Sequence, residues 1–381
     1  MTRQLTLREL NRATLARQGL LQPLTSNDPA GLIEHIGSLQ AQHPDWPALA
    51  LHSRLPTGIA LDLNGARAAR TVVRASLMRI TVHLVSARDF WPMSVVSLPY
   101  RRRQWQALFK MDPATSALGR RIRAAHPAAI AAMEERPLAI HEIESSLRAV
   151  IGDVELPGNR CLWRHITAFV PLIQVPHDGE RYGRARYVPA DTWLGPPTDT
   201  DGDLDAAALR VAERYLAAFG PASVADLAAY VGRGRDLSRW RRALAQIGDR
   251  LVMLHDATGR EMLDLADAPR PAPSGRVPPR LLARWDSLLL AYDPRQRARV
   301  LPDEHRGTVI TRNADVLPTF LVDGFIAGTW LPRHDDSGQP VAELRPFVPL
   351  DSAERAALEE EADRLLPTLG DGAFGRYPGT D

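Results

Sequence analysis

"PASVADLAAYVGRGRDLSRWRRALAQIGDRLVMLHDATGREMLDL", from Pro221 to Leu265, shows the clearest succession of predicted helices and strands in the chain. Ser223 is placed to cap a helix whose apolar residues recur at helical spacing, and GRGR interrupts that pattern. Asp236 is placed to cap a second helix, which has Trp240 and Leu244 on its apolar face. Two short apolar runs around the glycine of ATGR then predict a β-hairpin. A helix, a turn, a second helix and a hairpin in this order predict a winged helix.

Arginines gather around the second helix of this unit. Arg233 and Arg235 lie in the predicted turn, and Arg239 lies in the helix itself. An exposed row of arginines at this position fits contact with nucleic-acid phosphates. A solvated helix face accounts for the same residues equally well, so both interpretations stay open.

Two earlier stretches repeat the order of helices followed by strands. Near the N-terminus, Thr6 and Glu9 form a capping box, and Asp28 is placed to cap the next helix. Residues 71–77 are predicted to form a helix that runs into a strand. Residues 137–188 contain two helical patterns followed by a strand-rich stretch. The sequence therefore predicts an α+β chain that contains three helix–turn–helix units.

The last third of the chain begins with a linker and continues as strands. The composition of residues 269–279 predicts the linker. Residues 281–292 and 308–332 are predicted to be strands, and Asp323–Gly324 predicts a hairpin turn. The predicted parts are a first winged-helix unit (1–125), a second (126–200), a third (201–268), a β-rich element with an exposed basic loop (269–350) and an acidic C-terminal helix and tail (351–381).

Two further groups of arginines are candidate phosphate contacts. Residues 100–110 predict a basic amphipathic helix with Trp105 and Leu108 turned inward. Residues 293–307 predict an exposed basic loop or hairpin that touches a partner. Solvated surface is the alternative for both groups. The candidates are Arg101, Arg102, Arg103, Arg295, Arg297 and Arg299.

Composition and charge exclude several classes of protein. Lys+Arg number 47 and Asp+Glu 45, and the resulting net charge of +2 does not by itself indicate nucleic-acid binding. Lys110 is the sole lysine, a bias that a GC-rich genome explains, although arginine also suits bidentate phosphate contact. Cys161 is the only cysteine, which excludes internal disulfides and multi-cysteine zinc sites. No long apolar run predicts a membrane span or a signal peptide, so we expect a cytoplasmic protein.

The motifs of several common enzyme classes are missing from the sequence. There is no G-x-x-x-x-G-K, no dinucleotide fingerprint, no H-E-x-x-H and no nucleophile elbow. The 11 histidines show no spacing typical of metal ligands. We therefore expect neither a metal ion nor an organic cofactor.

A pair of glutamines in "LQAQHPDWPALALHSRL", residues 39–55, is the strongest candidate for chemistry. Pro44 forces the preceding residue into an extended conformation, so a helix is expected to end near Gln40 or Gln42. Two amides cannot act as bases, but they can hold a water and steady a positive charge by their dipoles. That suits attack on an oxocarbenium-like sugar carbon when the leaving group is already cationic. The alternative is that both glutamines only cap the end of a helix.

Three more residues are candidates for lining the same site. His43 and Asp45 are close to the glutamine pair in sequence, although nothing fixes the direction of the Asp45 side chain. His83, in the run TVH, is the third candidate, and a buried structural histidine is its alternative.

Five segments, taken in order, resemble the AlkZ/YcaQ family of winged-helix DNA glycosylases. The resemblance covers nearly the whole chain. The segments are LQAQ-x-P-x-x-P-x-LAL-x-SRL (39–55), RASLMRITVHLVSARDF (74–90), FGPASVADLAAYVG (219–232), RWDSLLLAYDPRQRARVLP (284–302) and VLPTFLVDGFIAGTW (316–330).

The resemblance implies a fold, an activity and a site. The implied fold is tandem winged helices around a concave DNA-binding surface, with an added C-terminal β element. The implied enzyme is a monofunctional glycosylase that removes bulky N7-alkylguanine from double-stranded DNA and unhooks interstrand crosslinks, without a cofactor. The family's catalytic Q-x-Q motif matches Gln40 and Gln42. We expect a monomer, with self-resistance to a DNA-alkylating natural product as a plausible role.

A second function class uses many of the same features. A winged-helix transcription regulator would bind DNA through the same arginine-bearing helices, and Gln40 and Gln42 would then have no catalytic role. Base excision by the protein, and its loss on substitution of either glutamine, distinguishes the two classes.

Overall fold

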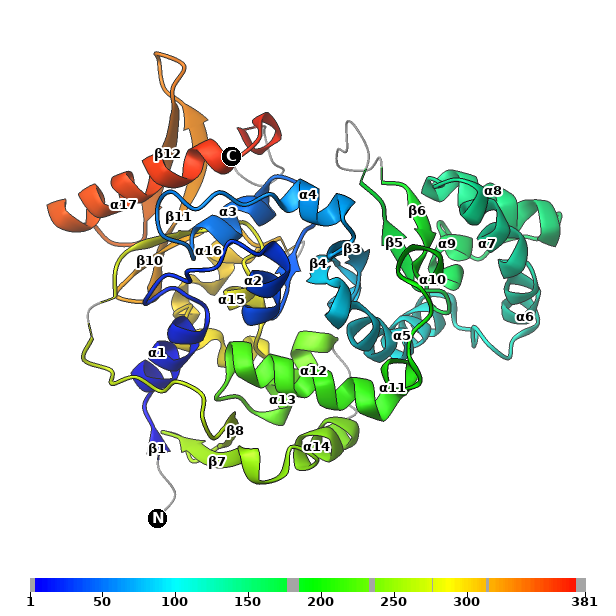
Figure 1. The fold of residues 1–381 in the computed structure, drawn as a ribbon, viewed down its shortest axis with the longest axis horizontal. Helices are drawn as coiled ribbons and strands as arrows, with labels where there is room; N and C mark the ends of the chain where they lie inside the picture. Colours follow the sequence, from blue (N-terminus) through cyan, green and yellow to red (C-terminus); the bar gives the residue numbers. More distant parts are fainter. Residues whose placement is uncertain (1–3, 177–184, 233–236, 276, 313–314, 375–381) are drawn as a thin grey trace.

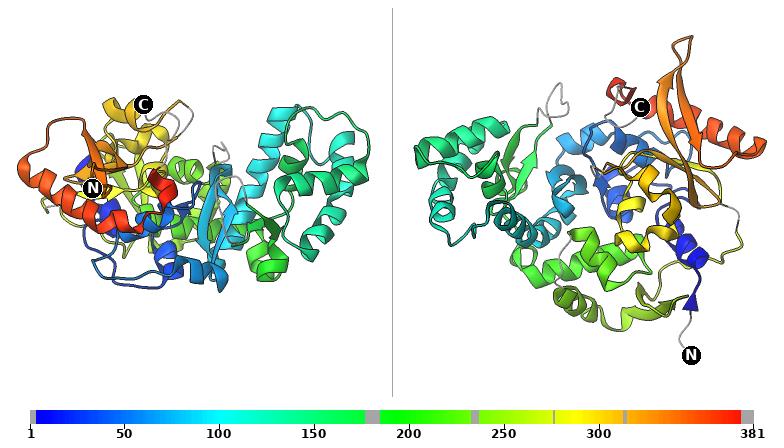
Figure 2. Two further views of the ribbon diagram at one scale, coloured as in Figure 1. Left: turned by 90° about the horizontal axis from the view of Figure 1, so that it is seen from above. Right: turned by 180° about the vertical axis from the view of Figure 1, so that it is seen from behind.

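The architecture comes from a computed structural model, which describes residues 4–176, 185–232, 237–275, 277–312 and 315–374. In Figure 1 a smaller helical lobe stands beside a larger body, which holds the N-terminal helices and the C-terminal strands. Both views of Figure 2 show the same two parts, with a few strands and a long helix between them.

The first part of the chain confirms two predicted helix starts. The hydroxyl of Thr6 accepts a hydrogen bond from the backbone N–H of Glu9 at 3.2 Å. Asp28 accepts from the backbone N–H groups of Ala30 and Gly31. The elements are β1 (Gln4–Leu5), α1 (Leu7–Arg17), α2 (Pro29–His35), β2 (Leu39–Gln40), α3 (Trp46–His52), α4 (Leu63–Ala68), β3 (Val72–Ser76), η1 (Met78–Ile80), β4 (Val82–Ser86) and α5 (Ala87–Phe109).

Two predictions for this part are wrong. Residues 71–77 were expected to be helical but form strand β3, because this stretch is rich in β-branched residues and is buried inside a sheet. The helix before the glutamines ends at His35, not near Gln40 or Gln42. Gly37 has φ 92°, a left-handed conformation that takes the chain out of the helix, and Gln40 ends strand β2.

A five-stranded antiparallel sheet joins the two parts of the molecule. Its order is β2-β4-β3-β5-β6, where β5 is Leu172–Gln174 and β6 is Tyr187–Pro189. The register sets Gln40 opposite His83 and Arg74 opposite Gln174. Strands from the first and second predicted units therefore share one sheet, while the predicted unit boundaries themselves stay a prediction.

The smaller lobe packs four helices around an apolar core. Trp105 of α5 is buried in this core and donates from its indole nitrogen to the carbonyl of Cys161 at 3.3 Å. Leu108 is 52% exposed, so the prediction that it turns inward is wrong; it lines a cleft instead. The helices are α6 (Ala117–Ala124), α7 (His126–Glu135), α8 (Ile140–Ile151) and α9 (Cys161–Ile166).

The stretch from Pro221 to Leu265 contains the two predicted helices and the predicted hairpin, while residues 233–236 of the predicted turn lie outside the described residues. Ser223 caps its first helix in a capping box with Asp226. Strand β1 adds to the hairpin in parallel and makes a three-stranded sheet, β1-β7-β8. The number of winged helices in the whole chain stays a prediction, and Asp236 lies outside the described residues. The elements are α10 (Ala190–Leu194), α11 (Asp199–Gly202), α12 (Leu204–Phe219), α13 (Val224–Val231), α14 (Leu237–Ala245), η2 (Gly248–Arg250), β7 (Leu251–Asp256) and β8 (Glu261–Leu265).

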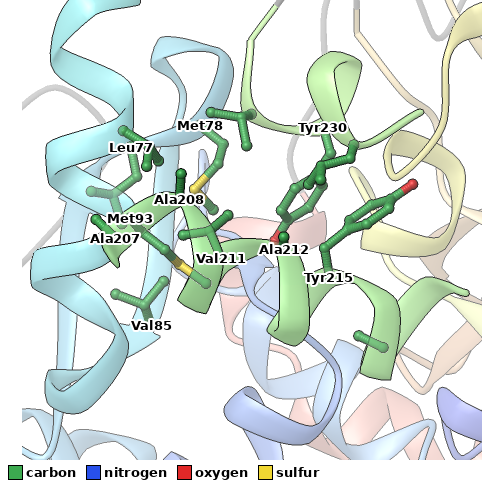
Figure 3. Close-up of a cluster of buried hydrophobic side chains, with 14 of the residues drawn as sticks. Leu77, Met78, Val85, Met93, Ala207, Ala208, Val211, Ala212, Tyr215 and Tyr230 are labelled. Carbon is green, nitrogen blue, oxygen red and sulfur yellow. The ribbon is translucent and has the colours of Figure 1, made fainter. Parts of the chain in front are cut away.

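Helix α12 anchors this unit against α5 and the end of the five-stranded sheet. Figure 3 shows Val211 and Tyr215 of α12 among apolar side chains that include Met78, Met93 and Tyr230. All of these side chains are buried. Because this cluster is continuous, the third unit and the sheet form one packed body.

The C-terminal part is a four-stranded sheet of order β12-β11-β10-β9 with short helices beside it. Asp323 and Gly324, with φ 46° and 81°, form the predicted hairpin turn. Residues 281–292 are a strand only at their start, because Asp286 caps a short helix there. The elements are β9 (Arg280–Leu282), α15 (Ser287–Leu290), η3 (Pro294–Arg299), η4 (Asp303–His305), α16 (Arg306–Val309), β10 (Thr319–Val322), β11 (Phe325–His334), β12 (Pro340–Pro346), α17 (Ser352–Leu365), η5 (Leu366–Thr368) and η6 (Asp371–Phe374).

Buried ion pairs join the first part of the chain to later parts. Arg17 of α1 binds Asp264 of β8 at 2.7 Å, with both side chains at most 1% exposed. Arg54 binds Asp286 with two hydrogen bonds of 2.8 and 3.0 Å, and these side chains are equally buried. Each pair spans more than 200 residues of sequence, so these contacts fix how distant elements sit together.

Candidate functional site

The glutamine pair lies at the end of β2, which is an edge strand of the five-stranded sheet. Gln40 ends β2 and is 9% exposed, while Gln42 is half-buried. Ala41 between them donates its N–H to the carbonyl of Val82 at 2.7 Å and accepts at its own carbonyl from Arg74 at 2.9 Å. Backbone contacts therefore hold the whole Q-A-Q segment.

The same part of the sheet orients both glutamine side chains. The amide oxygen of Gln40 accepts from the guanidinium of Arg79 at 3.2 Å. The amide oxygen of Gln42 accepts from the backbone N–H of Val82 at 3.3 Å. A guanidinium and a peptide N–H are donors only, so the chemistry of these partners settles which amide atom is the oxygen. Each oxygen retains a second lone pair.

His83 and Arg79 lie next to Gln40. The Nδ1–H of His83 donates to the carbonyl of Thr81 at 2.9 Å, which leaves Nε2 as an acceptor 3.4 Å from Arg79. Burial, and next the charge of Arg79, lowers the pKa of His83 to about 3. His83 is therefore neutral at neutral pH and is a buried structural neighbour of Gln40.

Arg79 is a site residue that sequence reasoning missed. One of its terminal nitrogens donates to the carbonyl of Tyr230 in α13 at 2.6 Å, and the other reaches Gln40. Burial lowers the pKa of Arg79 to about 10, so it keeps its charge at neutral pH. No spacing rule connects positions 40, 79 and 230; only the sheet and the packing of α13 bring them together.

His43 and Asp45 lie against each other beside the site. Nδ1 of His43 is 3.3 Å from the carboxylate of Asp45 at the start of α3. Burial lowers the pKa of His43, while the charge of Asp45 acts in the opposite direction. Neither residue lines the cleft described next, and their role in the site stays a prediction.

A cleft of about 440 Å³ opens beside Gln42, between the sheet and the lobe. Within the described residues its lining carries four arginines, three glutamines and no carboxylate. The cleft is therefore cationic and polar, with aromatic rings on its walls. The lining residues are Gln42, Arg74, Ser76, Ile80, Val82, Arg101, Gln104, Trp105, Leu108, Ile140, Arg160, Trp163, Arg164, Thr167, Gln174, Ala185 and Tyr187.

The arginine run of α5 divides into different environments. Arg101 is 9% exposed, donates to the carbonyl of Ser76 and lines the cleft. Arg102 is exposed, donates to the carbonyl of Ala168 at 3.1 Å and lies over the ring of Phe169. Arg103 is exposed. The three arginines therefore do not form one continuous surface.

The other predicted phosphate contacts are also in mixed positions. Arg295 is 81% exposed and paired with Asp293 at 3.0 Å, Arg297 is half-buried, and Arg239 is 4.0 Å from Asp205. Arg299 is 1% exposed and donates to the carbonyl of Pro221 at 2.7 Å, so the prediction that it contacts DNA is wrong. Tertiary packing draws it inward over the ring of Tyr292. Arg233 and Arg235 lie outside the described residues.

The described residues contain neither a metal-binding cluster nor a reactive thiol. In the part of the chain that the structure describes, no group of three His, Cys, Asp or Glu residues could hold a metal ion. Cys161 is buried, and burial raises the pKa of its thiol to about 11, so it is not a ready nucleophile. Among the described residues, no helix is long and apolar enough to cross a membrane.

The fold and the cleft define a class of protein. Two consecutive helices followed by a hairpin, in a molecule with a cleft rich in arginine, are typical of proteins that act on nucleic acid. The model of the family described as "DNA glycosylase AlkZ-like" matches residues 33–368, and the chain belongs to this family. The protein is thus a DNA glycosylase, an enzyme of DNA repair, and the predicted resemblance is confirmed.

A solved structure agrees with this assignment at the level of the fold. The DNA glycosylase AlkZ of Streptomyces sahachiroi is similar to this chain with a TM-score of 0.76 and 20% sequence identity. The similarity covers 96% of this chain and 97% of that one. No curated protein sequence gives a significant match. The shared structure confirms the mixed α+β fold class.

Proposed function

We propose that the protein is a monofunctional glycosylase that hydrolyses the N-glycosidic bond of bulky N7-alkylguanine in double-stranded DNA and unhooks interstrand crosslinks. The supporting observation is that Gln42 lines a cleft with no carboxylate among its described residues. A glycosidase without a carboxylic acid needs a leaving group that departs unassisted. A guanine alkylated at N7 is already cationic and meets that need.

The proposed reaction uses one water and no cofactor. The bond between C1′ and N9 breaks, and its electron pair goes to the purine, which leaves as neutral N7-alkylguanine. The water oxygen bonds to C1′ and its proton is released to solvent. The free lone pairs of the Gln40 and Gln42 oxygens hold this water and steady the sugar cation, since each oxygen accepts one hydrogen bond from the described residues.

The substrate defines the test of this proposal. Wild-type protein is incubated with a duplex that carries one N7-alkylguanine, and abasic sites are revealed by heat or alkali. Gln40→Ala and Gln42→Ala are each expected to lower the rate about 100- to 1,000-fold, the usual cost of removing a positioned electrostatic group. Gln106→Ala, an exposed glutamine of α5 outside the cleft, is the matched control. Excision that survives both site substitutions overturns the catalytic assignment.

Membership of a glycosylase family favours this enzyme over a transcription regulator. We further propose that Arg102, Arg103, Arg239, Arg295 and Arg297 are phosphate contacts of a monomer, and that the biological role is self-resistance to a DNA-alkylating natural product. Removing the gene from its host and measuring survival against such a compound tests that role. Unchanged survival contradicts it.

A further inference from the structure

Arg101, in the cleft beside Gln42, is a cation for which the described residues provide no anion. Arg101 is 9% exposed and donates to the neutral carbonyl of Ser76. Among the described residues, no carboxylate forms an ion pair with it. Burying a guanidinium without an anion is costly, and the burial lowers the pKa of Arg101 to about 10. Since Arg101 lines the cleft, the place where an anion would neutralise it is open to ligand.

The wall of the cleft formed by the lobe carries further cations. Arg160, the N-cap residue of α9, and Arg164, in the last turn of that helix, are exposed and line the same cleft as Arg101. Amide groups of Gln104 and Gln174 complete a lining rich in hydrogen-bond donors. Guanidinium groups match the geometry of phosphate oxygens better than any other side chain does. The chemistry of the lining therefore selects an oxyanion.

We propose that Arg101, Arg160 and Arg164 bind a phosphodiester group of the lesion-bearing strand inside this cleft, directly beside Gln42. The inference rests on the proposed function and deepens it, because it names the part of the substrate that enters the cleft. The volume of about 440 Å³ falls in the range of small-ligand sites and admits one phosphodiester with its sugar.

The positive charge of the cleft lining also determines which part of the substrate is excluded from the cleft. An N7-alkylguanine is a cation and is repelled by the arginines, so the base remains at the mouth of the cleft and does not enter it. The bound phosphate brings a negative charge close to the carbon on which the sugar cation develops. This anion from the substrate supplies the electrostatic stabilisation of the sugar cation that a carboxylate supplies in other glycosidases, while water remains the nucleophile.

The proposal is tested by replacing single phosphates of the DNA backbone with an uncharged analogue. A set of duplexes carries one N7-methylguanine and one methylphosphonate, placed in turn at each position near the lesion. For wild-type protein, one or two positions are expected to lower both the DNA affinity and the single-turnover excision rate about tenfold, the cost of a lost charged hydrogen bond. The double variant Arg160→Ala/Arg164→Ala is expected to bind the unsubstituted duplex more weakly and to lose most of that positional effect.

Controls separate this inference from the proposed function. Arg355→Ala, at an exposed arginine of α17, removes one positive charge outside the cleft and is expected to keep the wild-type positional profile. Arg101→Lys and Arg101→Met are compared after thermal unfolding has shown that both fold. The double variant keeps the test decisive if these buried substitutions do not fold, because Arg160 and Arg164 are exposed.

The outcomes are distinct. If wild-type protein excises no base but its affinity still depends on one phosphate through Arg160 and Arg164, the phosphate site stands and the proposed function fails. If wild-type protein excises the base and the double variant shows the same positional profile as wild type, the phosphate site is overturned and the glycosylase stands. A flat profile in wild-type protein also overturns the phosphate site.

Discussion

Two regions of this molecule bury arginine in opposite ways. In the larger body, Arg17 and Arg54 are buried against Asp264 and Asp286. At the edge of the sheet, Arg101 is buried and Arg79 is half-buried, and the partners that the structure gives them are neutral: carbonyl groups, the Gln40 amide and the His83 ring. The charges of the paired arginines are neutralised within the protein, and these residues stabilise the fold. The unpaired arginines keep their charge available beside the glutamines, which is what a site for an anionic polymer needs.

Removing one carboxylate from the larger body gives the largest expected effect. Asp286→Ala leaves Arg54 buried without an anion and removes the cap of α15, so we expect a loss of about 3–5 kcal/mol in the free energy of unfolding. Urea unfolding measures the change, with the exposed Asp336→Ala as control. A loss below about 1 kcal/mol, the scale of a surface ion pair, shows that Arg54 is not architectural in this sense.

The next largest expected effect is a loss of stability in acid, which arises from buried histidines. The pKa values of His83 and His126 are both lowered to about 3, mainly by burial. The unfolded chain takes up these protons below about pH 6.5, whereas the folded chain resists until about pH 3, so stability falls as the pH falls through this window. At pH 5 the cost from His83 is about 2 kcal/mol relative to pH 7.5.

Urea unfolding of wild-type protein and His83→Asn at both pH values checks this expectation. The variant should lose less stability on acidification than wild type does. Equal losses in the two proteins show that His83 is not held neutral beside Arg79.

Arg79 gives a smaller and more local effect. Arg79→Met removes the donor that holds the Gln40 oxygen, so we expect the single-turnover rate to fall about tenfold, the cost of one charged hydrogen bond, while DNA affinity changes little. Arg79→Lys should restore part of the rate. Arg79 acts through Gln40, so the substitution should add almost nothing to the loss in Gln40→Ala protein. Additive losses contradict this positioning role.

Arg101→Met gives the smallest expected change in stability and completes the comparison. Because no carboxylate of the described residues pairs with Arg101, an apolar side chain of similar length should change the free energy of unfolding by less than about 1 kcal/mol, or raise it. Thermal and urea unfolding measure the change. A loss as large as that of Asp286→Ala means that Arg101 is also architectural, and the contrast between the two regions disappears.

Much of the fold was accessible from local sequence patterns. The capping boxes at Thr6 and Ser223 depend on residues three apart, and the Asp323–Gly324 turn depends on two neighbours. The prediction of a helix over residues 71–77 is wrong, because these residues form a strand inside a sheet. Their pairing with a strand far away in sequence outweighs the local helical pattern.

Some residues of the candidate site can likewise be predicted from the sequence, and others cannot. Gln40 and Gln42 were found from their sequence and from the resemblance it carries, and they remain the proposed catalytic pair. Arg79 and the cleft lining at Arg160 and Arg164 were not found, since no sequence interval relates them to the glutamines. Arg299 looked like a surface residue in a polar stretch, yet packing against Tyr292 buries it.

By itself, then, the amino-acid sequence determined the mixed fold class, the helix starts, the hairpin turns and the family to which the enzyme belongs. Those features depend on interactions between residues a few positions apart, or on short contiguous motifs that can be recognised in the sequence itself. Only the tertiary structure decided which arginines are neutralised and which face the cleft, because charge pairing depends on distance in space. Arg54 pairs with a carboxylate 232 residues away, whereas Arg101 donates to a carbonyl 25 residues away and has no carboxylate partner among the described residues, and no local pattern distinguishes the two.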